Sequence, residues 1–300
     1  MLTVNQKYII LDDAAAKNGG TSLTLNSILE DRTQDCFFIS TTNLTSSFIE
    51  SNKDKLWILG NIMVVMTDEK IFNAFVELLE KSKFIKIEFD YNFCPYRSET
   101  AHEMFGKSKC ECPHDTNKGN KHLSKIYDLI CKKALHTFFM SERQRALYST
   151  HLPILKFECS SILSSCFSKK SLELLNKYSF NQKNNKYAIL EGYGGFHSYA
   201  KGFSQAKDYC HANNLEYDVL PNQEFEKHIE TLSSYKGLIF LPTIDDTCPR
   251  CIIEARLLNI DIICNSNCQH IYEFWWKDKS KTLEYLKSRP AHFWSIIDSL

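Results

Sequence analysis

The stretch KGLIFLPTIDDTCPRCIIEARLLNIDIICNSN, residues 236–267, decides the fold. It begins with a short apolar run, KGLIFLP, and continues through a polar turn into the helical pattern CPRCIIEARLLN. A second apolar run, IDIICNSN, follows at once. A strand, a helix and a strand in this order predict two parallel strands joined by a right-handed helical crossover.

The same alternation extends outward from this stretch across the second half of the chain. The apolar runs YAILEG and LEYDVLP come before it, and each is followed by a helical pattern. A helical tail rich in Trp and Lys comes after it. From residue 187 onward the sequence therefore predicts a doubly wound parallel sheet, whose ligands bind at the carboxyl ends of the strands.

The first half repeats this scheme more loosely. We expect strands in QKYIILDD, CFFISTT, LWILGNIMVVM, KFIKIEFDY, LHTFFMSE and ILKFECS, and a helix in EKIFNAFVELLEKS. The polar segment SKKSLELLNKYSFNQKNNK separates the halves and predicts a hinge near residues 166–186. The predicted fold class is α/β, with two Rossmann-like doubly wound parallel-sheet domains facing across a cleft.

Length and composition agree with two domains and exclude several classes of protein. The 300 residues are 43% hydrophobic, which is enough for the cores of two domains. Lys+Arg 36 balance Asp+Glu 36, so the protein has no net positive charge to attract nucleic acid, and no nucleic-acid partner is expected. The longest apolar runs are strand-sized and the N-terminus lacks the plan of a signal peptide, which predicts a soluble, cytoplasmic protein with no integral membrane segment. The twelve cysteines lie mostly in apolar segments, as reduced thiols do.

Two carboxylates stand out in the opening stretch. Asp246 follows the strand KGLIFLP, and Glu254 lies two turns into the next helix, within the apolar run IIEARLL. A carboxylate in such a run needs a partner or a ligand, and ribose hydroxyls would serve. The alternative is an ion pair between Glu254 and Arg250 on a solvated helix face.

A glycine-rich loop, GYGGFHSYAKG, follows the strand YAILE. Gly194 and Gly195 allow the backbone to approach a phosphate at a helix N-terminus, and Lys201 supplies a cation within reach. The loop departs from the dinucleotide-binding fingerprint, so a simple turn is the alternative. Its position at the same sheet edge as Glu254 favours a nucleotide diphosphate site.

In the first half, three residues are candidates for the same site. Gly19 and Gly20 begin the first helix, and Asp90 ends the strand KFIKIEFDY. Asp90 is a better candidate for a polar role than Glu88, for which a position facing solvent is the alternative. The alternatives are an ordinary helix start and a capped strand end.

The cysteines offer two further hypotheses. Cys94, Cys110, Cys112 and His114 lie in a long polar loop and could bind zinc, although their spacing is not that of the usual structural sites. Cys248 and Cys251, in CPRC at a helix start, could form a redox pair or a packing stripe. We assign no metal from the sequence.

The run that contains Asp246-x7-Glu254 resembles the donor-binding motif of GT-B glycosyltransferases of the family 4 type. The GYGGFHSYAKGFSQA loop resembles the glycine turn and Lys-Gly pair of that family, and MSERQRALY resembles the first-domain segment that closes the cleft. The tail EYLKSRPAHFWSIIDSL resembles the helix that crosses back to the first domain. The resemblance implies an acceptor-side domain at 1–166, a donor-binding domain at 167–283 and a returning helix at 284–300.

The resemblance also implies a function and roles for residues. It implies transfer of a sugar from a nucleotide-diphosphate sugar to an acceptor hydroxyl with retention of anomeric configuration, with no cofactor beyond this co-substrate. The acceptor would be a glycan, a lipid-linked molecule or a small molecule. The implied catalytic residues are Asp246, Lys201 and Asp90. The implied donor-binding residues are Glu254, Gly194, Gly195, Thr247, Cys248, Gly19 and Gly20.

Two positions depart from the family pattern. Asp246 stands where the family usually has Glu, and Phe196 stands where an Arg often precedes the Lys by five residues. Two alternatives therefore accompany the transferase hypothesis: an inactive GT-B scaffold that acts as a zinc-stabilised binding protein, and a sugar-nucleotide epimerase.

Overall fold

Ten strands, arranged in two sheets, form the centre of the chain in a computed structural model that describes residues 7–13, 19–113, 121–192 and 194–300. The first sheet has the order β2-β1-β3-β4-β5-β6 and the second the order β10-β9-β7-β8. Every neighbouring pair is parallel, and the doubly wound α/β fold class is therefore confirmed. The strands are β1 Tyr8–Asp12, β2 Cys36–Ser40, β3 Leu56–Leu59, β4 Lys83–Glu88, β5 Thr137–Phe139, β6 Ser160–Ile162, β7 Tyr187–Leu190, β8 Tyr217–Leu220, β9 Gly237–Phe240 and β10 Asp261–Cys264.

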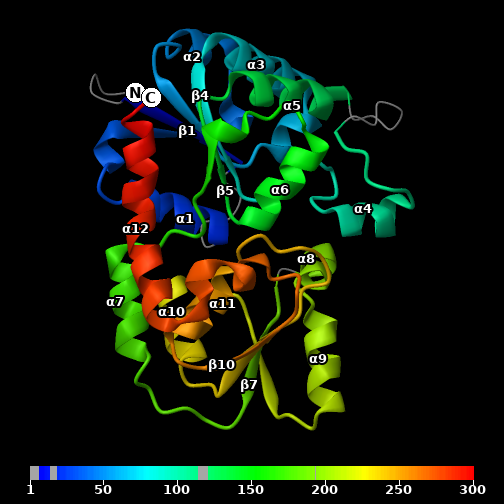
Figure 1. The fold of residues 1–300 in the computed structure, drawn as a ribbon, viewed down its shortest axis with the longest axis vertical. Coiled ribbons are helices and arrows are strands. Elements are labelled where there is room, and N and C mark those ends of the chain that lie inside the picture. The colour runs from blue at the N-terminus through cyan, green and yellow to red at the C-terminus, as the bar shows by residue number, and fades with distance from the viewer. Residues whose placement is uncertain (1–6, 14–18, 114–120, 193) are drawn as a thin grey trace. The chain divides into compact units, whose positions relative to one another are not determined.

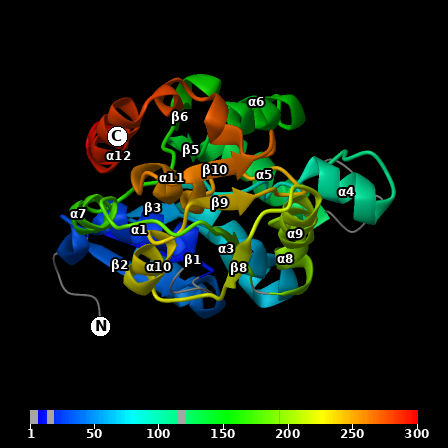
Figure 2. The same cartoon turned by 90° about the horizontal axis from the view of Figure 1, so that it is seen from below.

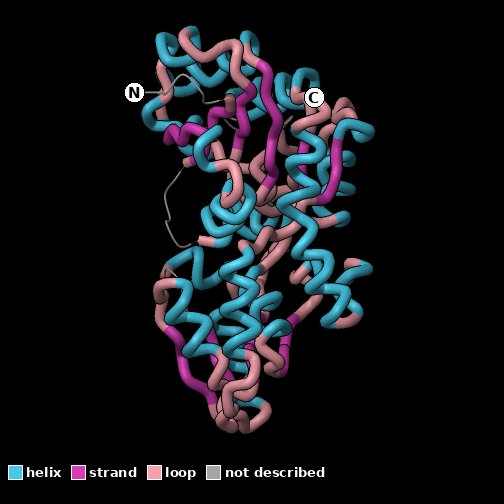
Figure 3. The backbone as a smooth tube through the Cα atoms, turned by 90° about the vertical axis from the view of Figure 1, so that its left-hand side faces the viewer, coloured by secondary structure: helices cyan, strands magenta, loops and turns pink. Residues whose placement is uncertain are grey.

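Helices connect the strands, as parallel pairing requires. Figure 3 shows helical segments alongside the strands of each sheet. The helices are α1 Gly20–Leu29, α2 Ser46–Glu50, α3 Glu69–Lys81, α4 Glu99–Gly106, α5 Lys121–Lys133, α6 Glu142–His151, α7 Lys169–Tyr178, α8 Gly195–Ala200, α9 Phe203–Ala212, α10 Phe225–Leu232, α11 Arg250–Leu257 and α12 Lys279–Ile297.

The chain divides into two compact units, each containing one sheet. The first unit comprises Met1–Lys17, Leu29–Ser164 and His292–Leu300, and the second comprises Asn18–Ile28 and Ser165–Ala291. The long helix α12 therefore begins in the second unit and ends in the first, as the predicted returning helix requires (Figure 1).

Alternating side chains cover the two faces of the first sheet. Ile9 and Trp57 belong to the core that α3 and α5 complete. Phe138 belongs to the other face, where its ring centroid lies 4.9 Å from that of Phe293 near the end of α12. Period-two alternation places neighbouring residues of a strand on opposite faces, so helices are needed on both sides.

The second sheet is also covered on both faces (Figures 1 and 2). Ala188 and Leu238 pack with α7, α10 and α11, whereas Tyr187 and Ile189 pack with α9. The inner strands β7 and β9 are buried on both faces and are apolar without alternation, whereas the edge strands β8 and β10 include Asp218 and Asp261.

Residues 292–300 are fixed to the first unit by aromatic and ionic contacts. The rings of Tyr8 and Trp294 lie 5.1 Å apart, and the Arg32 guanidinium stacks 4.6 Å from the Trp294 ring. Both nitrogens of the Arg32 fork donate to the Asp298 carboxylate, at 2.6 and 2.7 Å. This bidentate pair lowers the pKa of Asp298 and keeps its carboxylate charged.

Helix α3 shows how local sequence sets an element. Asp68 accepts hydrogen bonds from the backbone amides of Lys70 and Ile71, at 2.7 and 3.2 Å, and so caps the helix start. Phe72, Phe75 and other apolar residues at helical spacing then face the core. The helix predicted over 69–82 is confirmed.

Three segments differ from the sequence-based expectations. The run LWILGNIMVVM is a strand only over Leu56–Leu59, and Met63–Thr67 is a 3-10 helix. The strand expected in ILKFECS begins only at the last residue of that segment and occupies Ser160–Ile162. The predicted hinge segment contains α7, whose apolar residues pack in the second unit. The bounds of these elements depend on tertiary packing, and local sequence propensity does not indicate that packing.

A buried charge cluster lies at the end of β4, and it excludes the alternative that Glu88 faces solvent. Lys86 and Glu88 are both fully buried and their charged atoms lie 3.3 Å apart. The hydroxyls of Tyr127 and Tyr148 donate to the Glu88 carboxylate at 3.1 and 2.8 Å. Burial raises the pKa of both tyrosines well above the usual value, which keeps them as donors.

None of the described helices combines the length and the apolar composition that crossing a lipid bilayer requires.

Lys86→Met should destabilise the protein by about 3–5 kcal/mol, because it leaves the Glu88 carboxylate buried without its cation. Urea unfolding followed by circular dichroism measures the loss. The control is Lys81→Met, which breaks only the exposed i,i+4 pair with Glu77 and should leave the midpoint unchanged. Equal midpoints for the two variants would contradict a charge-paired cluster.

Candidate functional site

The loop between β9 and α11 holds Asp246 in the second unit. The Asp246 amide donates to the Asn267 carbonyl at 2.8 Å, and its carbonyl accepts from the Gln269 amide at 3.0 Å. Asp246 therefore pairs with Cys268 as a short parallel bridge beyond the ends of β9 and β10. These bonds fix the backbone of the loop, so the carboxylate has a defined position at the carboxyl edge of the sheet.

Gly202 fixes the opposite side of the same site. It turns the chain from α8 into α9 with φ +72°, a conformation that side chains disfavour. A Cβ at this position would lie 1.7 Å from the Leu241 carbonyl oxygen. The Thr243 amide and hydroxyl also bind the carbonyls of Ala200 and Tyr199, at 3.1 and 2.7 Å. The end of α8 is thus attached to the loop after β9.

Lys201 and Asp246 form an ion pair as a result. The Lys201 ammonium lies 2.5 Å from the Asp246 carboxylate, and their side chains are 37% and 12% exposed. The structure therefore brings together two residues that the sequence places 45 positions apart, and it leaves the ammonium accessible.

The glycine loop before α8 has an open backbone. Gly192, Gly194 and Gly195 all have positive φ, and no atom lies within 4 Å of a Cβ built at Gly194 or Gly195. The Gly194 amide donates to the Ser198 hydroxyl at 2.9 Å, which donates to the Glu191 carbonyl at 2.7 Å. These bonds shape the loop from within, while the space beside the two glycines lets another group approach the backbone.

Glu254 points inward from α11. It is 3% exposed, and one carboxylate oxygen accepts from the Arg250 Nε at 3.3 Å. The imidazole of His228 lies 3.9 Å from the other oxygen, which is longer than a hydrogen bond. The i,i+4 pair considered from the sequence is formed, but inside the unit and not on a solvated face.

Arg250 is a component of the site that sequence reasoning treated only as an alternative partner. Its guanidinium lies 3.7 Å from the Phe167 ring, and Nη1 donates to the Cys166 carbonyl. Its Nη2 is buried and has no hydrogen-bond partner in the structure. A Cβ at Gly20 would lie 3.7 Å from the Arg250 side chain, which places the start of α1 beside the start of α11. In the sequence, the signal that could have indicated this role was the position of Arg250 next to the apolar run IIEARLL.

Cys251, on α11, is half-buried near the charged residues of the candidate site. Desolvation raises the pKa of its thiol well above the usual value, Glu254 and Asp246 raise it further, and Lys201 lowers it. A thiol held protonated is a poor nucleophile, so this environment disfavours a redox role for CPRC.

The remaining predicted residues have separate positions. Thr247 is buried, and the Ser165 hydroxyl donates to the Cys248 carbonyl at 3.3 Å, next to the α11 start. Asp90 belongs to the first unit, where its carboxylate pairs with Arg97 and its carbonyl oxygen lies 2.8 Å from the Tyr148 hydroxyl, whose single proton it shares with Glu88. His114 lies outside the described residues, so its part in the zinc hypothesis has no structural counterpart.

No protein-family model and no curated protein sequence matches the chain. Solved structures do match its fold. HepE from Anabaena, in complex with UDP and glucose, aligns with a TM-score of 0.55 and 10% identity over 98% of this chain and 100% of that chain. An alpha-glucosyltransferase in complex with UDP and a 13-mer DNA containing a HMU base aligns with a TM-score of 0.53 and 10% identity, over 95% of this chain and 91% of that chain. The alpha-glucosyltransferase in complex with UDP-glucose and DNA containing an abasic site gives 0.52 and 9% identity, over 96% and 91%.

These structures have the GT-B glycosyltransferase architecture, and the match extends over both sheets of this chain. At 9–10% sequence identity, the similarity to these structures shows the fold of the chain alone.

Two glycine substitutions test how the site is held together. Gly202→Ala should cost about 3 kcal/mol or more, because it combines a disfavoured φ with a clash against backbone. Gly195→Ala also has a positive φ, +50°, but a Cβ there meets no described residue within 4 Å beyond its own helix and its chain neighbours, so about 1–2 kcal/mol is expected. Urea unfolding of both variants measures the difference, and equal costs would show that Leu241 does not confine Gly202.

Proposed function

We propose that the protein is a glycosyltransferase that transfers a sugar from a nucleoside diphosphate sugar to an acceptor hydroxyl. The observation that carries the proposal is the ion pair of Lys201 and Asp246 at the strand ends, next to the helix that carries buried Glu254. The fold supports it, since structures of this architecture were solved with UDP, glucose or UDP-glucose.

Lys201 is the proposed partner of the donor diphosphate. Its ammonium is partly exposed and lies beside loops that open toward the carboxyl edge of the sheet. Among the described residues other than chain neighbours, no atom lies within 4 Å of a Cβ built at Gly194 or Gly195, so a phosphate could approach this backbone and take the place of the Ser198 hydroxyl at the Gly194 amide. Donor binding would move the ammonium from the Asp246 carboxylate toward the phosphate, and Asp246 would then accept hydrogen bonds from sugar hydroxyls.

Glu254 is the proposed ribose ligand. Carboxylate oxygens accept two hydrogen bonds from a vicinal diol. The Arg250 Nε donates to one Glu254 oxygen, and the His228 imidazole lies 3.9 Å from the other. The unpartnered Nη2 of Arg250 is a second donor beside the same carboxylate. Gly19 and Gly20, at the start of α1, complete this side of the proposed donor site.

The chemistry needs no protein nucleophile. The acceptor oxygen forms a bond to the anomeric carbon as the bond from that carbon to the phosphate oxygen breaks, and the acceptor proton passes to the departing phosphate. Lys201 and the helix-start amides of Thr247 and Cys248 would stabilise the negative charge that builds on the phosphate. The resemblance to family 4 enzymes supports retention of configuration. Asp90, at the end of β4, is the proposed polar contact on the acceptor side.

Lys201→Met should weaken UDP binding by about 10- to 100-fold, because it removes a charge-assisted hydrogen bond. Wild-type protein at a UDP concentration of about 100 times Kd should gain about 2.7 kcal/mol, seen as a rise in Tm. Lys207→Met, on the neighbouring helix α9, is the matched control and should keep the full shift.

Glu254→Gln should also reduce this shift, with UMP and UDP affected alike because both carry the ribose. Wild-type protein that shows no shift with any nucleoside diphosphate or sugar conjugate would contradict donor binding.

Asp246→Asn should lower transfer from UDP-glucose about 100- to 1000-fold while UDP binding persists, since the lost contact is to the transferred sugar. Proton NMR of a reaction with a panel of sugar, lipid-linked and HMU-containing DNA acceptors measures rate and product anomer. Retention predicts an α-glucoside from the α-linked donor. Nucleotide binding without any transfer would favour the inactive scaffold, and donor turnover without acceptor would favour an epimerase.

A further inference from the structure

The segment from Cys94 to Cys112 follows β4 in the first unit. It contains one short helix, α4, on which Met104 and Phe105 are 49% and 45% exposed. The side chains that it buries are mainly thiols and an imidazole, since Cys94, His102, Cys110 and Cys112 are all at most 5% exposed. Potential metal ligands therefore make up most of the buried side chains of this segment.

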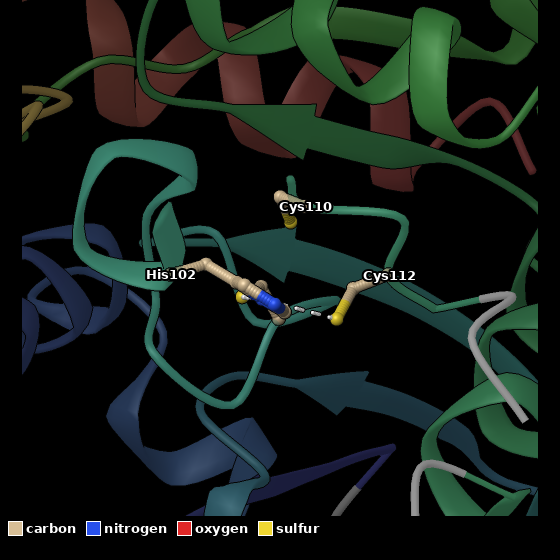
Figure 4. A group of neighbouring side chains, drawn as sticks. His102, Cys110 and Cys112 are labelled. Atoms are coloured by element: carbon tan, nitrogen blue, oxygen red, sulfur yellow. Dashed lines mark hydrogen bonds between the residues drawn. The ribbon is translucent and has the colours of Figure 1, made fainter. Parts of the chain in front are cut away.

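The four buried side chains converge on one point. One ligand atom from each lies within 4.8 Å of all the others. The sulfur atoms of Cys94 and Cys112 lie 3.3 and 3.6 Å from the His102 Nδ1, and Figure 4 shows the thiols of Cys110 and Cys112 directed toward the same imidazole. With zinc bonds of about 2.3 Å to sulfur and about 2.0 Å to nitrogen, tetrahedral geometry places such atoms about 3.6 Å apart.

The imidazole is held for ligation through Nδ1. Its other nitrogen, Nε2, lies 3.4 Å from the Ser108 hydroxyl, which can accept the ring proton. The ring edge meets Tyr96 at a centroid distance of 5.0 Å. A Cβ at Gly106 would lie 2.9 Å from the imidazole, so the glycine makes room for the ring. Outer contacts of this kind fix the tautomer and orientation of histidine ligands in metal sites.

We propose that Cys94, His102, Cys110 and Cys112 bind one Zn²⁺ ion in a tetrahedral structural site. Three thiolates and an imidazole suit zinc and not the oxygen-preferring cations Ca²⁺ and Mg²⁺. Four protein ligands leave no position for substrate, so the site is structural. The spacing C-x7-H-x7-C-x-C replaces the sequence-based set that used His114, and it differs from the short C-x2-4-C pairs of common zinc motifs.

The metal would hold the excursion after β4 in place. The Cys112 carbonyl lies 3.0 Å from the His151 Nδ1, and His151 Nε2 pairs with Glu99 at the start of α4. These contacts connect the segment to α6, so a metal ion joining residues 94 and 112 closes a loop that is already attached at its base. The proposal does not depend on the transferase activity, because no donor-site residue belongs to the cluster.

Elemental analysis of protein purified without an affinity tag tests the proposal. We expect about one zinc per chain, and Cys112→Ser or His102→Asn should lose it. Cys131→Ser removes another buried thiol of the first unit, on α5 and outside the cluster, and should keep the metal. Reconstitution with Co²⁺ should give the visible absorption of tetrahedral thiolate coordination, which the two ligand variants lack.

Wild-type protein supplies the second readout, which does not require the variants to fold. Chelator treatment should release zinc, lower the Tm and make the segment 94–112 sensitive to protease while the sheets stay intact. Zinc-free protein with an unchanged Tm, iron in place of zinc, or a disulfide among Cys94, Cys110 and Cys112 would each overturn the proposal.

Discussion

The close approach of Gly202 to the Leu241 carbonyl is the constraint on which the candidate donor site depends. Parallel strands bring their carboxyl ends to one edge, but this alone only places two loops near each other. The contact at Gly202, with the hydrogen bonds from Thr243, joins the end of α8 to the loop after β9. Lys201 precedes that glycine, and its ammonium reaches Asp246 because the joint leaves little freedom between the two loops.

Each unit also contains a buried ion pair near the end of a strand or the start of a helix. Burying two charges is costly, and well-packed apolar residues would often give equal stability. The pairs Lys86–Glu88 and Arg250–Glu254 therefore gain significance from what they position. In the second unit the carboxylate is oriented by a guanidinium that retains an unsatisfied nitrogen. In the first unit, the Glu88 carboxylate binds the hydroxyls of Tyr127 and Tyr148 at the end of β4. Asp90 follows this strand and precedes the segment 94–112, which contains the proposed zinc ligands.

The two parallel sheets could be predicted from the sequence because most strands of a doubly wound sheet are short apolar runs, each followed by turn residues. Asp246, Glu254 and Lys201 remain predicted site residues, and the sequence indicated them because each belongs to the loop or helix that follows a strand. The features that sequence reasoning did not predict depend on contacts between segments that are distant in the sequence. The inward direction of Glu88 follows from tyrosines about 40 and 60 positions away, and no spacing rule indicates that His102 turns toward three cysteines.

The charge balance around Lys201 bears on how a donor would bind. In the proposed resemblance to family 4 enzymes, Phe196 takes the place of a frequent arginine, and this residue is 47% exposed, so that position supplies no second cation. Its own charge is offset by Asp246 before any ligand enters, and a diphosphate must therefore compete with a carboxylate for it. Binding becomes favourable if the sugar hydroxyls take over Asp246 while the phosphate takes over Lys201. Such an exchange links recognition of the sugar to recognition of the phosphate, and it disfavours a bare nucleoside diphosphate relative to the intact donor.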